Sequence, residues 1–130
     1  MDTPTWISRA LVEAFHYTQL AEHGGSHGVR DSNALESALS RPRNRHAYHP
    51  DADLADLAAA YAFDLATSHP FVDGNKRTSF VAASVFLDLN GYEIGCTDEE
   101  VIEMMQNVAA GTLTEEEIAH RFRTSMSSRA

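Results

Sequence analysis

Apolar residues recur every three to four positions along most of the chain, a spacing that predicts amphipathic helices. The first predicted helix spans residues 8–23, with Ser8 as its N-cap and the glycine pair 24–25 as its end. A more central helix is predicted over residues 54–68, and the residues that share its apolar face are Leu54, Leu57, Ala58, Tyr61 and Leu65. Because each helix has one apolar face, both are expected to pack against a common core.

The second half of the chain predicts three more helices. Residues 77–89 are apolar nearly all round, which is typical of a helix buried in a core. Thr97 with Glu100, and Thr114 with Glu117, have the spacing of capping boxes, and apolar residues follow each pair. Two further helices are therefore expected to begin directly after Thr97 and after Thr114.

The remaining segments have weaker patterns. A short helix is predicted to start near Asp31 and to end at Pro42, because proline disfavours helical geometry in the residue before it. Residues 41–53, "RPRNRHAYHPDAD", show no periodicity and are predicted to form an exposed loop. Residues 92–95, "YEIG", are expected to form a short extended piece.

Six predicted helices without repeats indicate one compact all-α domain over residues 1–130, with its core at about residues 7–122 and a flexible tail at 123–130. The composition is that of a globular protein, 43% hydrophobic and 22% charged. A formal net charge of −9 argues against direct nucleic-acid binding, which needs a basic surface. The sequence has neither a stretch of roughly 20 apolar residues nor a signal-peptide pattern, so a cytoplasmic location without a membrane segment is expected.

Candidate chemistry is concentrated in "HPFVDGNKRT", residues 69–78, between two predicted core helices. Pro70 disfavours helical geometry at His69, which places the imidazole at a helix end. Phe71 and Val72 are expected to anchor the turn in the core. Polar groups therefore gather where one buried helix ends and the next begins.

The second half of this motif combines the features of an anion site. A helix N-terminus has unpaired N–H groups and the positive end of the helix dipole. Gly74 lets the backbone approach a ligand closely, and Asn75 can donate a hydrogen bond. Lys76, which is the only lysine beside nine arginines, and Arg77 add two positive charges at the same place. The pattern predicts a cradle for phosphate.

Two residues add groups that an anion site alone does not need. Asp73 would repel phosphate unless a divalent cation lay between them, which is how Mg²⁺ is usually held. A neutral imidazole can accept a proton from a hydroxyl, so His69 is a candidate base. A base, a metal carboxylate and a phosphate cradle together indicate transfer of a phosphorus-containing group from a nucleotide to a hydroxyl.

The motif resembles the signature of the Fic/Doc family, His-x-Phe-x-(Asp/Glu)-(Gly/Ala)-Asn-(Gly/Lys)-Arg. The stretches "EHGGSHGVRD", "LESALSRP" and "FLDLNG" are also similar to the short death-on-curing (Doc) branch, so the resemblance covers roughly residues 7–122. It implies an all-α Fic fold and a toxin of a toxin–antitoxin pair.

The resemblance leaves two reactions to distinguish. Members that transfer AMP generally have glycine at the position of Lys76 and a second arginine three residues after Arg77, where this chain has Phe80. The Doc pattern with lysine implies ATP bound with its γ-phosphate toward His69. A Doc-type kinase that phosphorylates a threonine or serine hydroxyl is therefore favoured over an AMP transferase. A non-catalytic Fic domain that only binds a partner is a third hypothesis, which the intact motif disfavours.

The kinase resemblance implies roles for the motif residues. His69 would take the proton of the target hydroxyl, and Asp73 would hold Mg²⁺ on the phosphates of ATP. The residues implied to bind those phosphates are Gly74, Asn75, Lys76 and Arg77.

The resemblance also implies partners. The implied target is a threonine of elongation factor Tu, whose modification would arrest translation. Neither Ser32 to Glu36 nor Thr112 to Glu116 completes the internal inhibitory motif (Ser/Thr)-x-x-x-Glu-(Gly/Asn) of many Fic proteins. A separate Phd-like antitoxin is therefore an expected partner.

Three arginines precede the motif in sequence. Arg41, Arg43 and Arg45 lie in the predicted loop, where Fic proteins carry a flap that aligns the target peptide. They are candidates for contacts with the target or with ATP. A solvated basic loop that only balances an acidic protein is an equally good reading of this segment.

Overall fold

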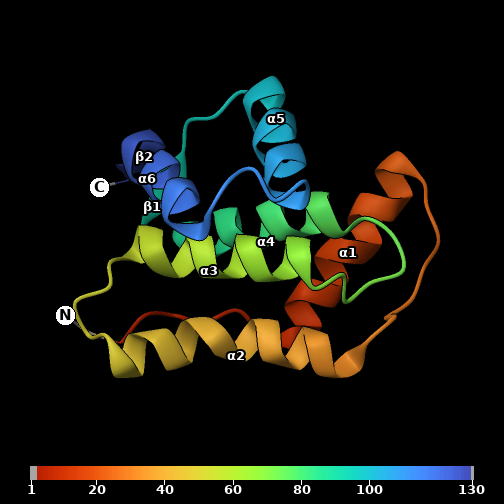
Figure 1. Ribbon diagram of the computed structural model, residues 1–130, viewed down its shortest axis with the longest axis horizontal. Helices are drawn as coiled ribbons and strands as arrows, with labels where there is room; N and C mark the ends of the chain where they lie inside the picture. Colours follow the sequence, from red (N-terminus) through yellow and green to blue (C-terminus); the bar gives the residue numbers. More distant parts are fainter. Residues whose placement is uncertain (1–2, 130) are drawn as a thin grey trace.

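The computed structural model describes residues 3–129, in which the elements along the chain are α1 (Arg9–His23), α2 (Ser32–Tyr48), α3 (Leu54–Thr67), α4 (Asn75–Leu89), β1 (Tyr92–Ile94), α5 (Asp98–Ala109), α6 (Glu115–Ser125) and β2 (Met126–Ser128). Figure 1 shows α3 in the middle, with α2 along one side of it, α4 behind it and α1 crossing near one end. The prediction of an all-α fold with about six helices is confirmed, with a short two-stranded sheet added.

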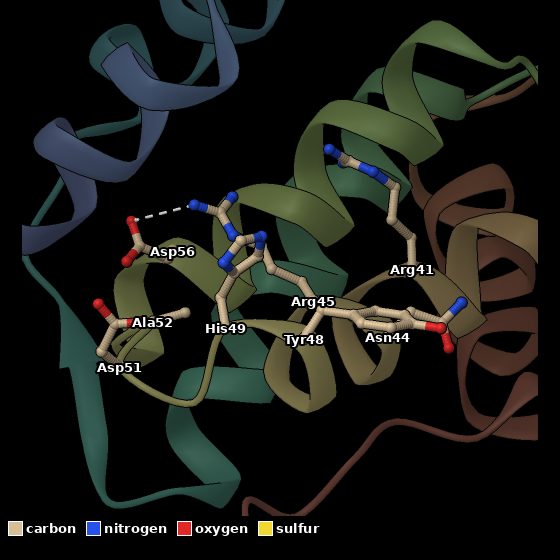
Figure 2. A pocket seen from close by; sticks show the side chains of 8 residues that line it. All are labelled: Arg41, Asn44, Arg45, Tyr48, His49, Asp51, Ala52 and Asp56. Carbon is tan, nitrogen blue, oxygen red and sulfur yellow. Dashed lines mark ion pairs between the residues drawn. The ribbon is translucent and has the colours of Figure 1, made fainter.

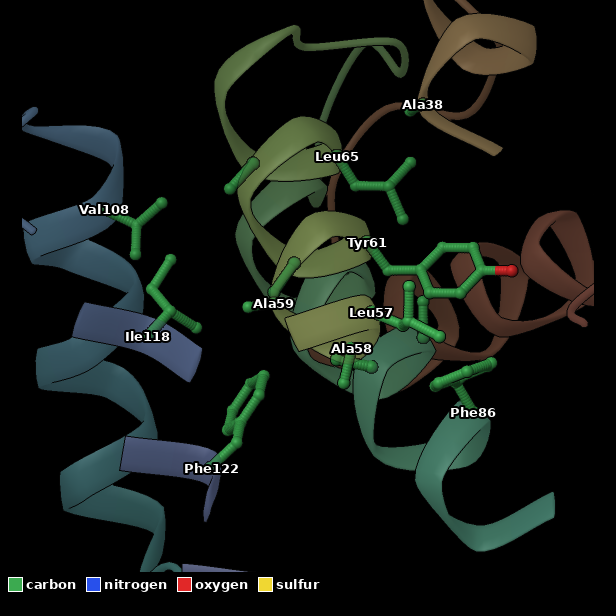
Figure 3. Packing of buried hydrophobic residues seen from close by; sticks show 14 of the residues in the cluster. Ala38, Leu57, Ala58, Ala59, Tyr61, Leu65, Phe86, Val108, Ile118 and Phe122 are labelled. Carbon is green, nitrogen blue, oxygen red and sulfur yellow. The ribbon is translucent and has the colours of Figure 1, made fainter. Parts of the chain in front are cut away.

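The alanine-rich helix α3 forms the centre of the core. Helices α2, α4 and α6 all pack against it, and residues 57–62 are buried without interruption. Because alanine side chains are short, neighbouring helices can approach α3 on several sides. Figure 3 shows Phe86 of α4 beside Tyr61 on one side of α3, and Val108 and Ile118 of α5 and α6 on the other. The helix that leads into the motif at residues 69–78 is thus held on nearly all sides.

Local capping explains where most helices begin. The side chain of the N-cap residue accepts a backbone N–H bond in five of the six helices, at Ser8, Asp31, Asp53, Thr97 and Thr114. Both predicted capping boxes are confirmed, and a third is made by Asp53 and Asp56 at the start of α3. Helix α4 is different, because its N-cap is Gly74 and no side chain caps it.

The predicted end of the second helix at Pro42 is wrong. Helix α2 continues through Pro42 to Tyr48, so residues 41–48 are helical and not an exposed loop. The Pro42 ring is buried, and Arg41 and Arg45, four residues apart, both pair with Glu115 of α6. These contacts between helices outweigh the missing backbone hydrogen bond that proline imposes.

The segment predicted as a flexible tail contains regular secondary structure over the described residues. Helix α6 continues to Ser125, and β2 pairs antiparallel with β1, which is the extended piece expected at "YEIG". Beyond the strand, the N–H of Arg129 donates to the carbonyl of Gly91 at 3.0 Å. Residue 130, the last of the predicted tail, lies outside the described residues.

Candidate active site

The connection between α3 and α4, residues 68–74, carries the first half of the motif. Ser68 is the C-cap of α3, and His69 follows with φ at 49°, in the left-handed region that residues with a Cβ rarely adopt. Phe71 is buried and anchors this α3–α4 connection, as predicted. Val72 is 49% exposed, so the prediction that it also anchors the turn is wrong. The connection therefore buries Pro70 and Phe71 and leaves the side chains of His69 and Asp73 exposed.

The side chain of Asn75 closes the α3–α4 connection. Its Oδ1 accepts a hydrogen bond from the N–H of Phe71, and its Nδ2 donates to the carbonyl of Phe71, both at 3.0 Å. The amide was predicted to donate to a ligand, but these two bonds to backbone use it to shape the turn. Its effect on a ligand would therefore pass through the backbone that it holds.

The N-terminus of α4 has uncapped N–H groups and two cationic side chains beside it. Gly74 has φ at 77° and no capping side chain, so the first N–H groups of α4 lack the partner that a cap would supply. The side chains of Lys76 and Arg77 are exposed and make no hydrogen bond or ion pair with any residue between 3 and 129. Two unneutralised cations therefore stand at the positive end of a helix dipole.

Only one of the two carboxylate oxygens of Asp73 accepts a hydrogen bond from a described residue. Its Oδ2 accepts the N–H of Ser26 at 2.9 Å, while Oδ1 has no hydrogen-bond partner among the described residues. An exposed carboxylate with one oxygen available suits Mg²⁺ held jointly with phosphate oxygens. Between residues 3 and 129 no three His, Cys, Asp or Glu side chains gather as a metal site of their own. The one available oxygen of Asp73 fits a metal ion whose other ligands include phosphate oxygens of a bound nucleotide.

His69 is the remaining predicted group. It belongs to the exposed residues, and its imidazole makes no hydrogen bond with any described residue. Its backbone carbonyl, in contrast, accepts a hydrogen bond from the guanidinium of Arg30 at 2.7 Å. The ring is thus presented to solvent on a backbone that is held from another part of the chain.

Two residues that were not predicted from the sequence, His16 and Arg30, hold the α3–α4 connection. His16 is 5% exposed; its ring stacks on Phe71 at 3.9 Å between centroids, and its Nε2 donates to the carbonyl of Asp73 at 2.7 Å. Its position midway between the buried Val12 and Leu20 on α1 is a sequence signal that it faces inward. Arg30 had no such signal, because it lies in an irregular loop.

The three candidate flap arginines lie on the C-terminal half of α2. Arg45 pairs with Asp56 near the start of α3, and about 16 Å of helix separates Asp56 from Thr67 at the other end of α3. Arg41 and Arg45 line a cavity of about 620 Å³ together with Tyr48, His49 and other residues of this end (Figure 2). Arg43 is exposed on another side of α2. Arg45 therefore lies at the end of α3 that is far from His69, whereas Arg41 pairs with Asp64, in the last turns of α3.

Ion pairs also occupy two of these arginines. Glu115 bridges Arg41 and Arg45 at 2.6 Å to each, and Arg41 also contacts Asp64 of α3 at 3.0 Å. Burial raises the pKa of the Asp64 carboxyl, and the neighbouring Arg41 opposes this shift. This network joins α2, α3 and α6. It explains the positions of Arg41 and Arg45 without a bound ligand.

Comparison with known proteins agrees with these features. The model of the Fic/DOC family matches residues 6–87, so the chain belongs to the Fic/Doc family. The chain is 30% identical over 117 residues to the Protein kinase doc of Escherichia phage P1, covering 90% of this chain and 92% of that protein. It is 41% identical over 90 residues to the Toxin Doc of Mycolicibacterium smegmatis, covering 67% and 68% respectively. These relatives place it in the Doc branch.

None of its helices between residues 3 and 129 has the length and apolar character needed to span a bilayer.

Proposed function

We propose that this chain is a Doc-type toxin that transfers the γ-phosphate of ATP to a threonine or serine hydroxyl of a protein. The observation that carries the proposal is the pair of unneutralised cations, Lys76 and Arg77, at the uncapped N-terminus of α4, next to the connection that presents His69 and Asp73. Support comes also from the relatives, which are named Protein kinase doc and Toxin Doc.

The proposed reaction assigns one task to each group. His69 accepts the hydroxyl proton as the hydroxyl oxygen forms a bond to the γ-phosphorus, and the bond to the β-phosphate oxygen breaks so that ADP leaves. Lys76, Arg77 and the N–H groups at the start of α4 bind the phosphates and stabilise the charge that shifts during transfer. Asp73 Oδ1 would hold Mg²⁺, which when bound shields phosphate charge.

AMP transfer is the alternative to transfer of the γ-phosphate. The position where AMP-transferring members generally have a second arginine is occupied by Phe80, a half-buried ring that meets the ring of Phe122 edge-on at 6.3 Å. That position faces the core and offers no cation. With Lys76 in place of glycine, this arrangement favours phosphate over AMP as the transferred group.

The proposed biological partners follow from the Doc branch. The target is proposed to be elongation factor Tu, so that phosphorylation arrests translation in the cytoplasm. A Phd-like antitoxin is proposed to bind the toxin and suppress transfer. A toxin that remained fully active with saturating antitoxin would contradict this partner.

The test uses ATP labelled at either the α or the γ position, with elongation factor Tu and Mg²⁺. The wild-type protein is expected to transfer γ-label only, and His69→Ala is expected to lower the rate by roughly 10²- to 10⁴-fold, the usual contribution of a general base. His49→Ala is the matched control, because His49 is an exposed histidine at the far end of α2 and its loss should leave the rate unchanged.

Each other outcome has a defined meaning. Retention of α-label on the target would show AMP transfer and overturn the kinase assignment. Transfer that persists in His69→Ala would remove the base from the mechanism. A folded wild-type protein that labels no protein in a whole cell extract would support the third hypothesis, a Fic domain that only binds a partner.

A further inference from the structure

Residues 24–31, here called the docking loop, lie against the α3–α4 connection and hold it by backbone contacts. The N–H groups of Arg30 and Asp31 both donate to the carbonyl of Pro70, at 2.7 and 3.1 Å. The N–H of Val72 donates in return to the carbonyl of Gly28 at 3.0 Å. These bonds run in both directions between two irregular segments, so each segment fixes the shape of the other.

Arg30, an exposed residue, adds a side-chain contact to this arrangement. Its Nε donates to the carbonyl of His69 at 2.7 Å, and one terminal nitrogen donates to the carbonyl of Ser68 at 3.0 Å. Ser68 is the C-cap of α3, where carbonyl groups lack helical partners and the helix dipole favours a positive charge. One planar guanidinium therefore satisfies two consecutive carbonyls that the end of α3 leaves open.

The backbone at His69, whose carbonyl Arg30 binds, has a conformation that is unfavourable in isolation. His69 has a Cβ, precedes a proline and yet has φ at 49°, a combination that an isolated chain rarely adopts. The direction of the imidazole depends on this backbone conformation, because the ring itself makes no hydrogen bond with a described residue. The contacts that orient His69 are thus contacts to its main chain, and the guanidinium of Arg30 makes one of them.

We propose that Arg30 is a positioning residue for the proton acceptor, which fixes the imidazole of His69 toward the incoming hydroxyl by holding the carbonyls of residues 68 and 69. This inference rests on the proposed function. Arg30 acts in it through the backbone and does not touch ATP. Its loss should therefore affect the chemical step while leaving nucleotide binding intact.

The test compares Arg30→Met and Arg30→Lys with a matched control, Arg129→Met. Arg129 also donates to a carbonyl near a helix end, that of Asp88 at 2.8 Å, and is exposed, but it lies at the opposite end of α4 from the motif. Rates of γ-label transfer give kcat and the KM for ATP. Labelling of histidine with carbon-13 gives the imidazole signals of His69, assigned by their loss in His69→Ala.

Arg30→Met is expected to lower kcat by roughly 10- to 100-fold with the KM for ATP changed less than about twofold, because small misplacement of a reacting group slows chemistry strongly. Its His69 signal should shift or broaden. Arg30→Lys should recover only part of kcat, because an ammonium cannot span two carbonyls as the planar fork does. Arg129→Met should match wild type in kcat, KM and the His69 signal.

Two results would overturn the proposal. An increase in the KM for ATP that Arg30→Lys fully restores would show that Arg30 serves as a phosphate-binding charge. A His69 signal and a kcat unchanged in Arg30→Met would show that the backbone holds its shape without the side chain. If folded wild-type protein transfers no γ-phosphate, the proposed function fails instead, and the His69 signal alone then decides whether Arg30 orients the ring.

Discussion

The buried ring of His16 holds the α3–α4 connection from inside, opposite to Arg30 on the outside. Since a carbonyl can only accept, the hydrogen bond to Asp73 requires the proton on Nε2 of His16. The same ring lies flat on Phe71. A Cβ at position 74 would lie 3.4 Å from Leu20 and 3.6 Å from the His16 ring. His16 therefore fixes both the course of the connection and the space in which α4 begins.

Replacement of His16 separates its two contacts. His16→Phe keeps a ring on Phe71 but leaves the carbonyl of Asp73 without its donor, so the free energy of unfolding should fall by about 1 kcal/mol. Urea unfolding at neutral pH measures this change. His16→Gln is the paired variant, because its amide N–H can replace the donor but cannot stack.

The two His16 variants should differ in transfer rate. If the hydrogen bond matters for catalysis, the rate with His16→Gln should exceed the rate with His16→Phe when both are folded. Equal rates for both variants and wild type would show that the carbonyl of Asp73 needs no donor from α1.

Helix α2 shows which parts of the fold a local pattern can predict. Caps depend on residues within one turn of each other, so the starts at Ser8, Thr97 and Thr114 could be read from the sequence. The end of α2 could not, because its last two turns are held by Glu115, which is about 70 residues away from Arg45. A proline within a helix is a reliable stop only where no such contact opposes it.

Pro42 offers a direct measure of that competition. Pro42→Ala supplies the N–H that proline lacks, which favours the helix by about 3 kcal/mol, and removes about two buried methylene groups, which costs roughly 1.6 kcal/mol at ~0.8 kcal/mol each. The variant should therefore be more stable by about 1 kcal/mol in urea unfolding. A less stable variant would show that the buried ring of Pro42 contributes more through packing than its backbone costs.

The members of the candidate active site could be named from the sequence, but their arrangement could not. Their closeness in sequence places Asp73, Lys76 and Arg77 around the start of α4, so this juxtaposition follows from the sequence alone. The groups that hold it, His16 and Arg30, come from parts of the chain 57 and 39 residues away from their partners. The spacing of His16 from Val12 and Leu20 indicates an inward-facing ring, but neither its partner nor the contact of Arg30 has a periodic signal, so only the folded chain reveals them.

Both ends of the described chain meet at the far end of α4, away from the candidate active site. The side chain of Asn90 accepts the N–H of Thr5 at 2.8 Å and donates to the carbonyls of Thr5 and Phe86 at 3.0 and 2.7 Å. The next residue, Gly91, accepts the N–H of Arg129. One turn thus joins the N-terminal segment, the core helix α4 and the residue that follows β2.

Asn90→Ala should loosen both ends while leaving the chemistry in place. Three hydrogen bonds are lost at a half-buried position, so the free energy of unfolding should fall by about 2 kcal/mol. Amide hydrogen exchange should quicken in residues 5–7 and in β2, because these segments open with the turn. Asn44→Ala is the matched control, since the side chain of Asn44 is exposed and makes no hydrogen bond with a described residue. The rate of γ-label transfer by the folded variant should equal that of wild type, because α3 and the docking loop hold His69 independently of this end. Faster exchange around residues 68–74 in Asn90→Ala would contradict that independence and show that the whole of α4 transmits the loss to the active site.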